Sequence, residues 1–164
     1  MADIGNMLTM DIKSNPNLRR NIVIRTFSGN DLFSVMQIWL DANIKAHSFI
    51  PKDYWTDNYA IVKDMLPQAE IYVYEDSDTN QVNGFIGLTD NYIEGIFVRE
   101  GLQSIGIGKQ LLDYAKEIKS SMRLSVYQKN TRAIAFYQRE QFVIRSESID
   151  NSTNEKEFIM TWSK

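Results

Sequence analysis

The chain of 164 residues has the length of a single domain, and its 43% of hydrophobic residues is enough for a sizeable core. A formal net charge of −3 at pH 7 argues against a broad nucleic-acid surface, and the absence of cysteine excludes disulfides, thiolate metal ligands and a cysteine nucleophile. No apolar run reaches about 18 residues and no signal peptide is recognisable, so we expect no membrane span and a cytoplasmic location.

The N-terminal half of the chain begins with a segment that lacks periodicity. We predict a loose arm or extension over residues 1–20 and one domain over 21–164. Alternation and helical spacing then predict a strand, two helices separated at Pro51, and a strand pair. These elements are the strand Asn21–Arg25, helices near Asp31–Ile44 and Asp53–Met65, and the strands Ile71–Glu75 and Val82–Thr89.

The central stretch reads as a strand, a glycine-rich turn and an amphipathic helix. The strand is Tyr92–Val98, the turn covers 99–108, and the helix runs from Lys109 with apolar residues at helical spacing. A helix start has unpaired N–H groups and partial positive charge, so it attracts a phosphate. Glycines before it let the backbone approach the anion closely.

Two common phosphate-binding patterns do not fit this turn. In the Walker pattern, Gln103 would stand in place of the first glycine and Gln110 in place of the metal-binding hydroxyl. In the dinucleotide pattern, Leu111 would stand in place of the third glycine. A nucleotide-binding domain is therefore a minor alternative.

The C-terminal half adds four elements. They are the strand Arg123–Tyr127, the helix Asn130–Glu140, and a hairpin of Phe142–Ile149 with Glu155–Trp162. The complete order predicts an α/β (α+β) domain whose mixed sheet of about seven strands carries helices on both faces.

Two motifs resemble those of the GNAT family of N-acetyltransferases. Gln103–Gly108 reads Gln-x-x-Gly-x-Gly, after a strand with Ile93, Ile96 and Val98, and is similar to the family's acetyl-CoA pyrophosphate loop. Residues 130–137 match a second family signature, Asn-x-x-Ala-x-x-Phe-Tyr, although Gln141 stands where the family commonly has glycine. The resemblance covers about residues 21–163 and implies the GNAT fold.

The resemblance also implies a cosubstrate and its binding residues. The cosubstrate is acetyl-CoA, and no metal is required. The expected cofactor-binding residues are Ile96, Phe97, Val98, Gln103, Ser104, Ile105, Gly106, Ile107, Gly108, Lys109, Asn130, Ala133, Phe136 and Tyr137. Segments such as Trp39–Trp55 look like those of a small single-domain bacterial subgroup, some of whose members are assigned to protein-lysine acetylation. The acceptor is then an amine: a protein lysine, a peptide N-terminus or a small amine.

Amine acetylation needs a group that holds the oxyanion and an acid for the departing thiolate. A backbone N–H of Ile96–Val98 can hold the oxyanion if that strand splays from its neighbour. By resemblance Tyr137 lies near the thioester sulfur, and a phenol with a pKa of about 10 can protonate a thiolate whose pKa is about 8.5. A buried packing role is the alternative for Tyr137.

The proton of the attacking amine can be removed in three ways. Glu94 points at the acceptor if Glu94-Gly95 forms a β-bulge. His47, the only histidine, lies in the break between the two N-terminal helices, which roof the acceptor channel in the family. The third solution is no dedicated base, with protons leaving through water. An ordinary strand carboxylate and a helix-capping histidine are the structural alternatives.

Further functional alternatives remain open from the sequence alone. The chain could be an acetyl-CoA-binding sensor with little catalysis, as a monomer or a homodimer. The aromatic residues near the helix break either pack the core or wall an amine channel, where cation–π attraction would favour an ammonium. They are Trp39, Phe49, Tyr54, Trp55 and Tyr59.

Overall fold

The computed structural model describes residues 21–164, so the arm predicted over residues 1–20 lies outside the described residues. The strands are β1 (Ile22–Thr26), β2 (Glu70–Asp76), β3 (Gln81–Thr89), β4 (Tyr92–Val98), β5 (Ser121–Tyr127), β6 (Val143–Asp150) and β7 (Glu155–Ser163). The helices are α2 (Leu32–Ala46), α3 (Lys52–Met65), α4 (Ile107–Ile118) and α5 (Thr131–Arg139), with short 3-10 turns at Gly29–Asp31 and Leu66–Gln68.

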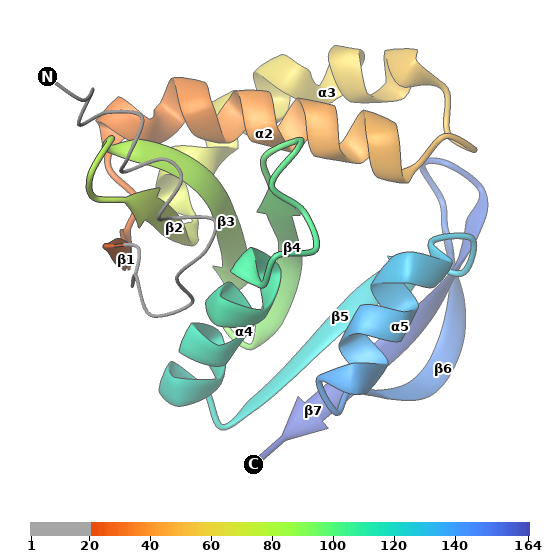
Figure 1. Ribbon diagram of the computed structural model, residues 1–164. Coiled ribbons are helices and arrows are strands. Elements are labelled where there is room, and N and C mark those ends of the chain that lie inside the picture. The colour runs from red at the N-terminus through yellow and green to blue at the C-terminus, as the bar shows by residue number, and fades with distance from the viewer. Residues whose placement is uncertain (1–20) are drawn as a thin grey trace, which may run out of the picture.

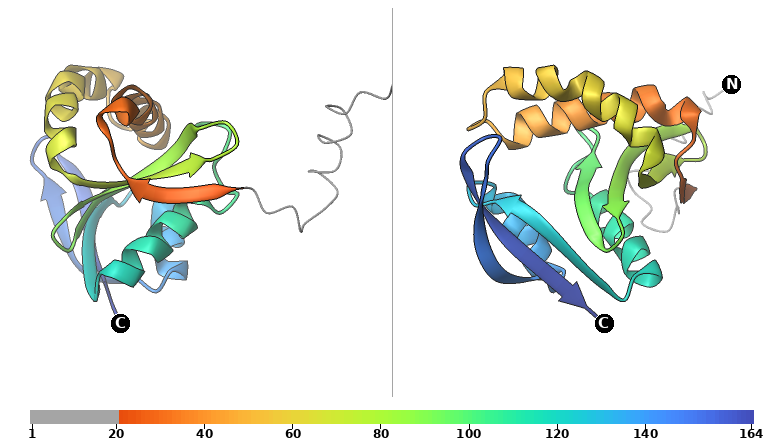
Figure 2. Two further views of the ribbon diagram at one scale, coloured as in Figure 1. Left: turned by 90° about the vertical axis from the view of Figure 1, so that its left-hand side faces the viewer. Right: turned by 180° about the vertical axis from the view of Figure 1, so that it is seen from behind.

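The seven strands form one mixed sheet in the order β1-β2-β3-β4-β5-β7-β6. Helices α2 and α3 lie over one face, here named the α2/α3 face, and α4 and α5 lie over the other, the α4/α5 face (Figures 1 and 2). The predicted fold class is therefore confirmed. Among residues 21–164, no helix is long and apolar enough to cross a membrane.

The core consists of two hydrophobic clusters, one on each face of the sheet. Strand β3 is buried along nearly its whole length and contributes to both, because successive side chains alternate between faces. Phe85 packs toward α2 and α3, whereas Ile86 and Leu88 pack toward α4. Burial of each such side chain contributes about 1.5–3 kcal/mol, which fixes both helix pairs on the sheet.

Two helix starts differ slightly from the predicted positions. Helix α4 begins at Ile107, two residues before the predicted Lys109, because Gly106 serves as its N-cap in a left-handed conformation. Asn130 is the N-cap of α5, so the helix itself begins at Thr131. Both caps lie at positions that the motifs had marked for cofactor binding.

The predicted C-terminal hairpin is present, but its strands are not in sequence order. Strand β7 pairs antiparallel with both β5 and β6, so β6 becomes the edge strand. Glu157 on β7 lies between Tyr127 on β5 and Ser148 on β6. Residues directly opposite one another share a face, so these three side chains lie together.

A gap opens in the sheet between β4 and β5. The two strands are parallel and pair only at Tyr92 with Arg123. Beyond this pair they diverge toward α2, as Figure 1 shows. This is the splay that the oxyanion hypothesis assumed.

Candidate active site

The turn before α4 presents backbone N–H groups to an anion. Gly106 has φ 97°, a conformation that glycine adopts without steric cost. The first intrahelical bond runs from the Gln110 N–H to the Gly106 oxygen at 3.0 Å. The N–H groups of Ile107, Gly108 and Lys109 therefore have no partner within the helix. Because the dipole adds partial positive charge there, this turn suits a pyrophosphate.

The polar side chains of the turn bond to other protein groups, so the backbone N–H groups are the ones that face an anion. Gln103 Nε2 donates to the Val98 oxygen at 3.4 Å, and Ser104 is hydrogen-bonded by the Arg132 guanidinium. Lys109 directs its ammonium to Asp113, at 2.9 Å, and to Glu140. The apolar side chain of Ile105, also in this turn, points away from the core and is 53% exposed.

Arg132 is a residue that the sequence reasoning missed. It lies in the first turn of α5 and reaches Ser104 across the entrance of the turn before α4. Its position two residues after Asn130 was the only sequence signal. It places a permanent positive charge beside the predicted pyrophosphate site.

Residues from three elements converge next to the turn. A Cβ on Gly108 would lie 3.8 Å from Ile96 Cγ2, 3.8 Å from Phe136 Cζ and 3.9 Å from Val98 Cγ2. Asn130 Oδ1 accepts the Ala133 N–H at 3.2 Å and so caps α5 beside them. Ile96 and Val98 of β4, Gly108 of α4 and Phe136 of α5 thus lie together on the α4/α5 face.

The backbone of β4 directs N–H groups into the gap. The Arg99 N–H donates to the Asn83 oxygen at 2.8 Å, so alternate residues of β4 bond to β3. By this alternation, the N–H groups of Ile96 and Val98 face away from β3, toward the gap. Phe97 differs: its ring lies on the α2/α3 face, over Gly95 and stacked on Phe85 with centroids 4.8 Å apart.

Tyr137 belongs to the core cluster on the α4/α5 face and is only 8% exposed. It packs against Phe136 and Phe142, with ring centroids at 5.2 and 5.5 Å. Burial raises the pKa of its phenol, and Tyr92 adds to the effect. Within residues 21–164 no side chain hydrogen-bonds its hydroxyl. A neutral phenol with an uncommitted O–H has the properties of a proton donor.

Glu94 lies at the bulge that the base hypothesis assumed. Gly87 pairs with Gly95 and Leu88 pairs with Ile93, so Glu94 is the extra residue of β4. Its Cβ is 3.7 Å from the position of a Cβ on Gly87, which points to the α2/α3 face. The exposed Glu94 carboxylate is therefore on the face opposite the Ile96 and Val98 side chains.

His47 occupies a different environment. It is the C-cap of α2, and its ring stacks on Trp55 at 5.3 Å and meets Tyr127 edge-on at 5.1 Å. Its Nε2 lies 3.2 Å from Asn130 Nδ2. Because Asn130 Oδ1 is used by the cap, Nδ2 donates, so Nε2 accepts and the proton is on Nδ1. Burial lowers the pKa of His47 to about 4.

His47 and Asn130 together connect the two halves of the site. The imidazole comes from the end of α2 over the α2/α3 face, and the amide caps α5 on the other face. Nε2, the only basic atom of this tautomer, is occupied by Asn130. Nδ1 is buried without a hydrogen-bond partner in the described part of the chain. The structure brings Glu94, and not His47, to an accessible position.

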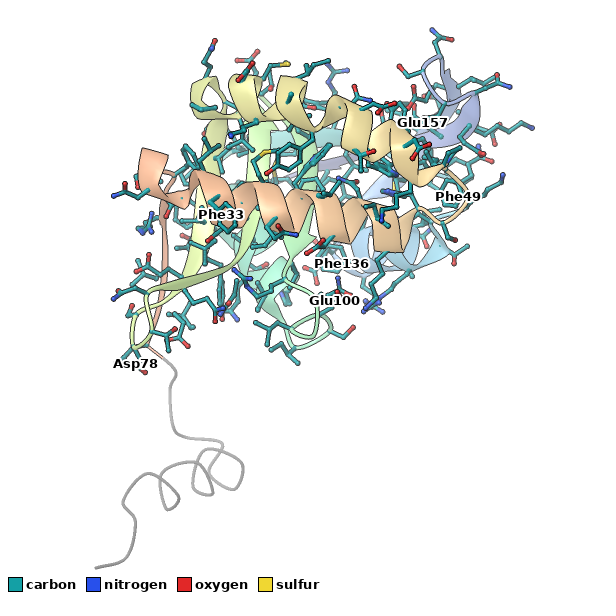
Figure 3. The ribbon with its side chains drawn as sticks, turned by 90° about the horizontal axis from the view of Figure 1, so that it is seen from above. Phe33, Phe49, Asp78, Glu100, Phe136 and Glu157 are labelled. Atoms are coloured by element: carbon teal, nitrogen blue, oxygen red, sulfur yellow. The ribbon has the colours of Figure 1, made fainter. Side chains whose placement is uncertain are left out.

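A cluster on the α2/α3 face was not predicted. Tyr127 donates to Asp150 at 2.6 Å, and Ser148 donates to Glu157 at 3.1 Å. Burial raises the pKa of Glu157, and the nearby Asp150 adds to this. Seen from above, Glu157 and Phe49 lie toward α3, whereas Phe136 lies beyond α2 on the other side (Figure 3). Only the strand register, which no local pattern gives, brings these side chains together.

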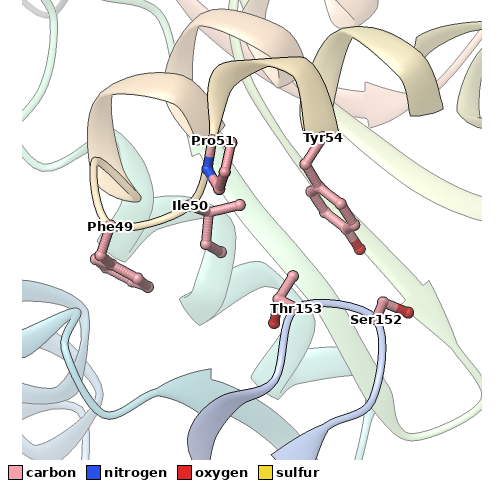
Figure 4. Close-up of a pocket in the computed structure, with 6 residues that line it drawn as sticks. All are labelled: Phe49, Ile50, Pro51, Tyr54, Ser152 and Thr153. Atoms are coloured by element: carbon pink, nitrogen blue, oxygen red, sulfur yellow. The ribbon is translucent and has the colours of Figure 1, made fainter.

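A pocket of about 250 Å³ opens beside this cluster (Figure 4). Phe49, Ile50, Pro51 and Tyr54 form one wall, and Ser152 and Thr153 of the β6–β7 turn form the other. The Lys129 ammonium lies 5.5 Å from the Phe49 ring, so this wall already accommodates a cation. Trp39 and Trp55 belong instead to the core.

Comparison with known proteins identifies the family. Residues 67–144 match the family model for an acetyltransferase (GNAT) domain. The chain is 31% identical over 142 residues to the peptidyl-lysine N-acetyltransferase YiaC of Escherichia coli (strain K12), covering 85% of this chain and 96% of the relative. This chain belongs to the GNAT acetyltransferase family. The family, the N-acetyltransferase class and the acetyl donor predicted from the sequence are thereby confirmed.

Solved GNAT structures share the fold. The solution structure of apo YjaB from Escherichia coli aligns with a TM-score of 0.76 at 22% identity, over 85% of this chain and 96% of that one. PaiA N-acetyltransferase from Thermoplasma acidophilum, in complex with coenzyme A, aligns with a TM-score of 0.75 at 20% identity, over 88% and 99% of the two chains.

The residues around the turn before α4 fit the acetyl donor of this family. The free N–H groups before α4 and the Arg132 guanidinium suit a pyrophosphate, and the Ile96 and Val98 N–H groups that face the gap would hold a pantetheine arm. When bound, acetyl-CoA would supply the acetyl group as a thioester. Among residues 21–164, no group of three or more His, Asp or Glu side chains is placed to hold a metal ion.

The conformation of Gly106 gives a first prediction. An alanine at φ 97° is strained by about 1–2 kcal/mol, so Gly106→Ala should distort the turn and raise the KM for acetyl-CoA about tenfold. Gly101→Ala is the matched control, because Gly101 has φ 83° but lies outside the first turn of α4. Equal losses of acetyl-CoA affinity in both variants, by calorimetry, would contradict an anion-binding role for the turn.

The neutral, buried ring of His47 gives a second prediction. Its pKa is about 4 in the folded protein against 6.5 unfolded, so the unfolded state binds the proton more readily. The stability conferred by the neutral ring is complete above about pH 6.5 and is lost as the pH falls toward 4.

His47→Gln keeps an acceptor for Asn130 but cannot titrate. Between pH 7 and pH 4.5, the wild type should lose about 2 kcal/mol more free energy of unfolding than His47→Gln. Urea denaturation at both pH values measures this difference, and carboxylates that titrate in both proteins cancel. The same acid sensitivity in the two proteins would show that His47 is not held neutral.

Proposed function

We propose that this protein transfers the acetyl group of acetyl-CoA to lysine side chains of polypeptides. The observation that carries the proposal is the divergence of β4 and β5 beyond their single pair, which leaves the sheet unpaired between the α4/α5 face and the α2/α3 face. A lysine can extend its long side chain into such a gap while its backbone stays on that face. Relatives named peptidyl-lysine N-acetyltransferases, YiaC and the Salmonella typhimurium YjaB, support this choice of acceptor.

The charges of the α2/α3 face suit an ammonium group. Glu94 is exposed there at the bulge, and Glu157 makes no ion pair in the described part of the chain. A carboxylate without a cationic partner attracts a lysine ammonium, and the Phe49 and Tyr54 rings beside it provide cation–π contacts.

Each residue has one task in the proposed mechanism. Glu94 removes a proton from the ammonium, and the neutral amine attacks the acetyl carbonyl to form the new N–C bond. The Ile96 and Val98 N–H groups hold the negative charge that develops on the oxygen. As the C–S bond breaks, Tyr137 gives its proton to the sulfur. The nitrogen then loses a second proton, which restores the phenol through solvent, and Glu94 releases the first proton to solvent.

The test is thiol release from acetyl-CoA with matched acceptors. A peptide with a blocked N-terminus and one lysine should be acetylated on that lysine, with the site located by mass spectrometry. The same peptide with norleucine in place of lysine, a lysine-free peptide with a free N-terminus, and a polyamine serve as comparisons. Turnover confined to the last two would overturn the lysine assignment. Tight coenzyme A binding without any turnover would indicate a sensor instead.

A further inference from the structure

A second depression lies on the α2/α3 face, at the opposite end of strands β5, β7 and β6 from the pocket of Figure 4. It encloses about 390 Å³, and no carboxylate is among its lining residues. Two arginines line it, Arg123 on β5 and Arg145 on β6. Asn91, Ser121 and Ser163 add polar groups. We call it the arginine pocket.

Arg145 is directed into the arginine pocket by a β-bulge. Ile144 pairs with Met160 and Ser146 pairs with Ile159, so Arg145 is the extra residue of β6. Its Nε donates to Thr161 Oγ1 at 3.0 Å, which leaves the outer nitrogens of the guanidinium for another partner. The bulge and this hydrogen bond together fix the direction in which the remaining guanidinium N–H groups point.

Arg123 is likewise positioned but unpaired. Its guanidinium lies 5.3 Å from the centre of the Tyr92 ring. Among residues 21–164, neither Arg123 nor Arg145 makes an ion pair with a carboxylate. Glu94 lies on the same face, but within the described residues its carboxylate forms no ion pair with either guanidinium group. The protein has a net charge of −3, so two adjacent arginines without an acidic partner require an explanation.

The arginine pocket borders the route of the acceptor. Arg123 pairs with Tyr92 at the closed end of the gap between β4 and β5. Arg123 also lies opposite Thr161, which is four residues from Glu157 along β7. This spacing corresponds to about 13 Å, the length of about four residues of an extended peptide. One peptide lying on the face can therefore reach both places.

We infer that the arginine pocket binds an acidic side chain of the acceptor polypeptide, about two to five residues from the target lysine. The inference rests on the proposed lysine acceptor and adds a specificity determinant to it. A guanidinium recognises a carboxylate through paired, charge-assisted hydrogen bonds, and two guanidinium groups strengthen this preference. Acceptor lysines near glutamate or aspartate are thereby selected over lysines in neutral or basic segments.

The experiment uses N-terminally blocked peptides with one lysine in a neutral background. A single glutamate is placed in turn at each of about five positions on either side, and the peptide with glutamine at the same position is the reference. In the wild type, kcat/KM should be about 3–10-fold higher for glutamate at one register. Arg123→Gln and Arg145→Gln should remove this preference and leave the glutamine peptides unaffected. Arg139→Gln on α5, with the same loss of charge outside the pocket, should keep it.

Other outcomes separate this inference from the proposed function. Efficient acetylation of lysine peptides without any glutamate preference would overturn the arginine pocket alone. A binding measurement with norleucine in place of lysine gives a readout that does not need turnover. If the glutamate-bearing norleucine peptide binds the wild type several-fold more tightly than Arg145→Gln, the pocket stands even if no lysine is acetylated. Equal binding to both proteins would overturn it.

Discussion

Replacing Tyr137 by phenylalanine is expected to lower kcat at least about tenfold while the affinity for acetyl-CoA changes little. Without the phenol, the thiolate must leave as an anion or take its proton from water. The ring itself remains, so its packing against Phe136 and Phe142 is kept. Burial raises the pKa of Tyr137, so the phenol stays protonated over the working pH range and acts only as a donor.

The matched control is Tyr74→Phe. Tyr74 belongs to the same core cluster and is 5% exposed, and its hydroxyl meets Gln110 Nε2 at 3.5 Å. Both substitutions remove one hydroxyl from a buried ring. Steady-state kinetics should show the loss of kcat for Tyr137→Phe alone, with coenzyme A binding measured by calorimetry for both. An equal decrease in both variants, or none in Tyr137→Phe, would remove the tyrosine from the proton transfer.

The elements predicted from the sequence are those that local patterns determine. Strand β4 has the predicted bounds Tyr92–Val98, because its apolar residues end at a clear glycine-rich turn. The segments predicted to bind the cofactor could be read from the sequence, since the turn before α4 and the first turns of α5 are continuous segments. Their residues need only a strand, a turn and a helix to come together.

The acceptor side depends on strand order and register, which the sequence does not show. The position of β7 between β5 and β6 places Glu157 beside Tyr127 and Ser148. Had β6 paired with β5 instead, Ser148 and Glu157 would lie elsewhere relative to the gap. The contact between His47 and Asn130 is also of this kind, because 83 residues separate them along the chain.

The second large effect is expected for Glu94→Gln. A glutamine at this position keeps the size and the exposure of the side chain but cannot accept the proton of the ammonium. We expect kcat/KM for a lysine peptide to fall about 10²-fold or more near neutral pH. A general base must be unprotonated to act, so the dependence of the wild-type rate on this base appears as a decrease of the rate toward acidic pH. The acidic limb of the pH–rate profile should therefore disappear in the variant.

Glu157→Gln and His47→Gln are the comparisons that make this prediction specific. Glu157 faces the same side of the sheet and has no cationic partner among the described residues, although burial raises its pKa. Its replacement should therefore weaken the binding of the ammonium and raise KM. His47 Nε2 is occupied by Asn130, so His47→Gln should keep the acidic limb. An acidic limb that survives in Glu94→Gln and vanishes in Glu157→Gln would move the base from the bulge of β4 to β7. An acidic limb that persists in all three would mean that the ammonium loses its proton to water, with the carboxylates acting only through their charge.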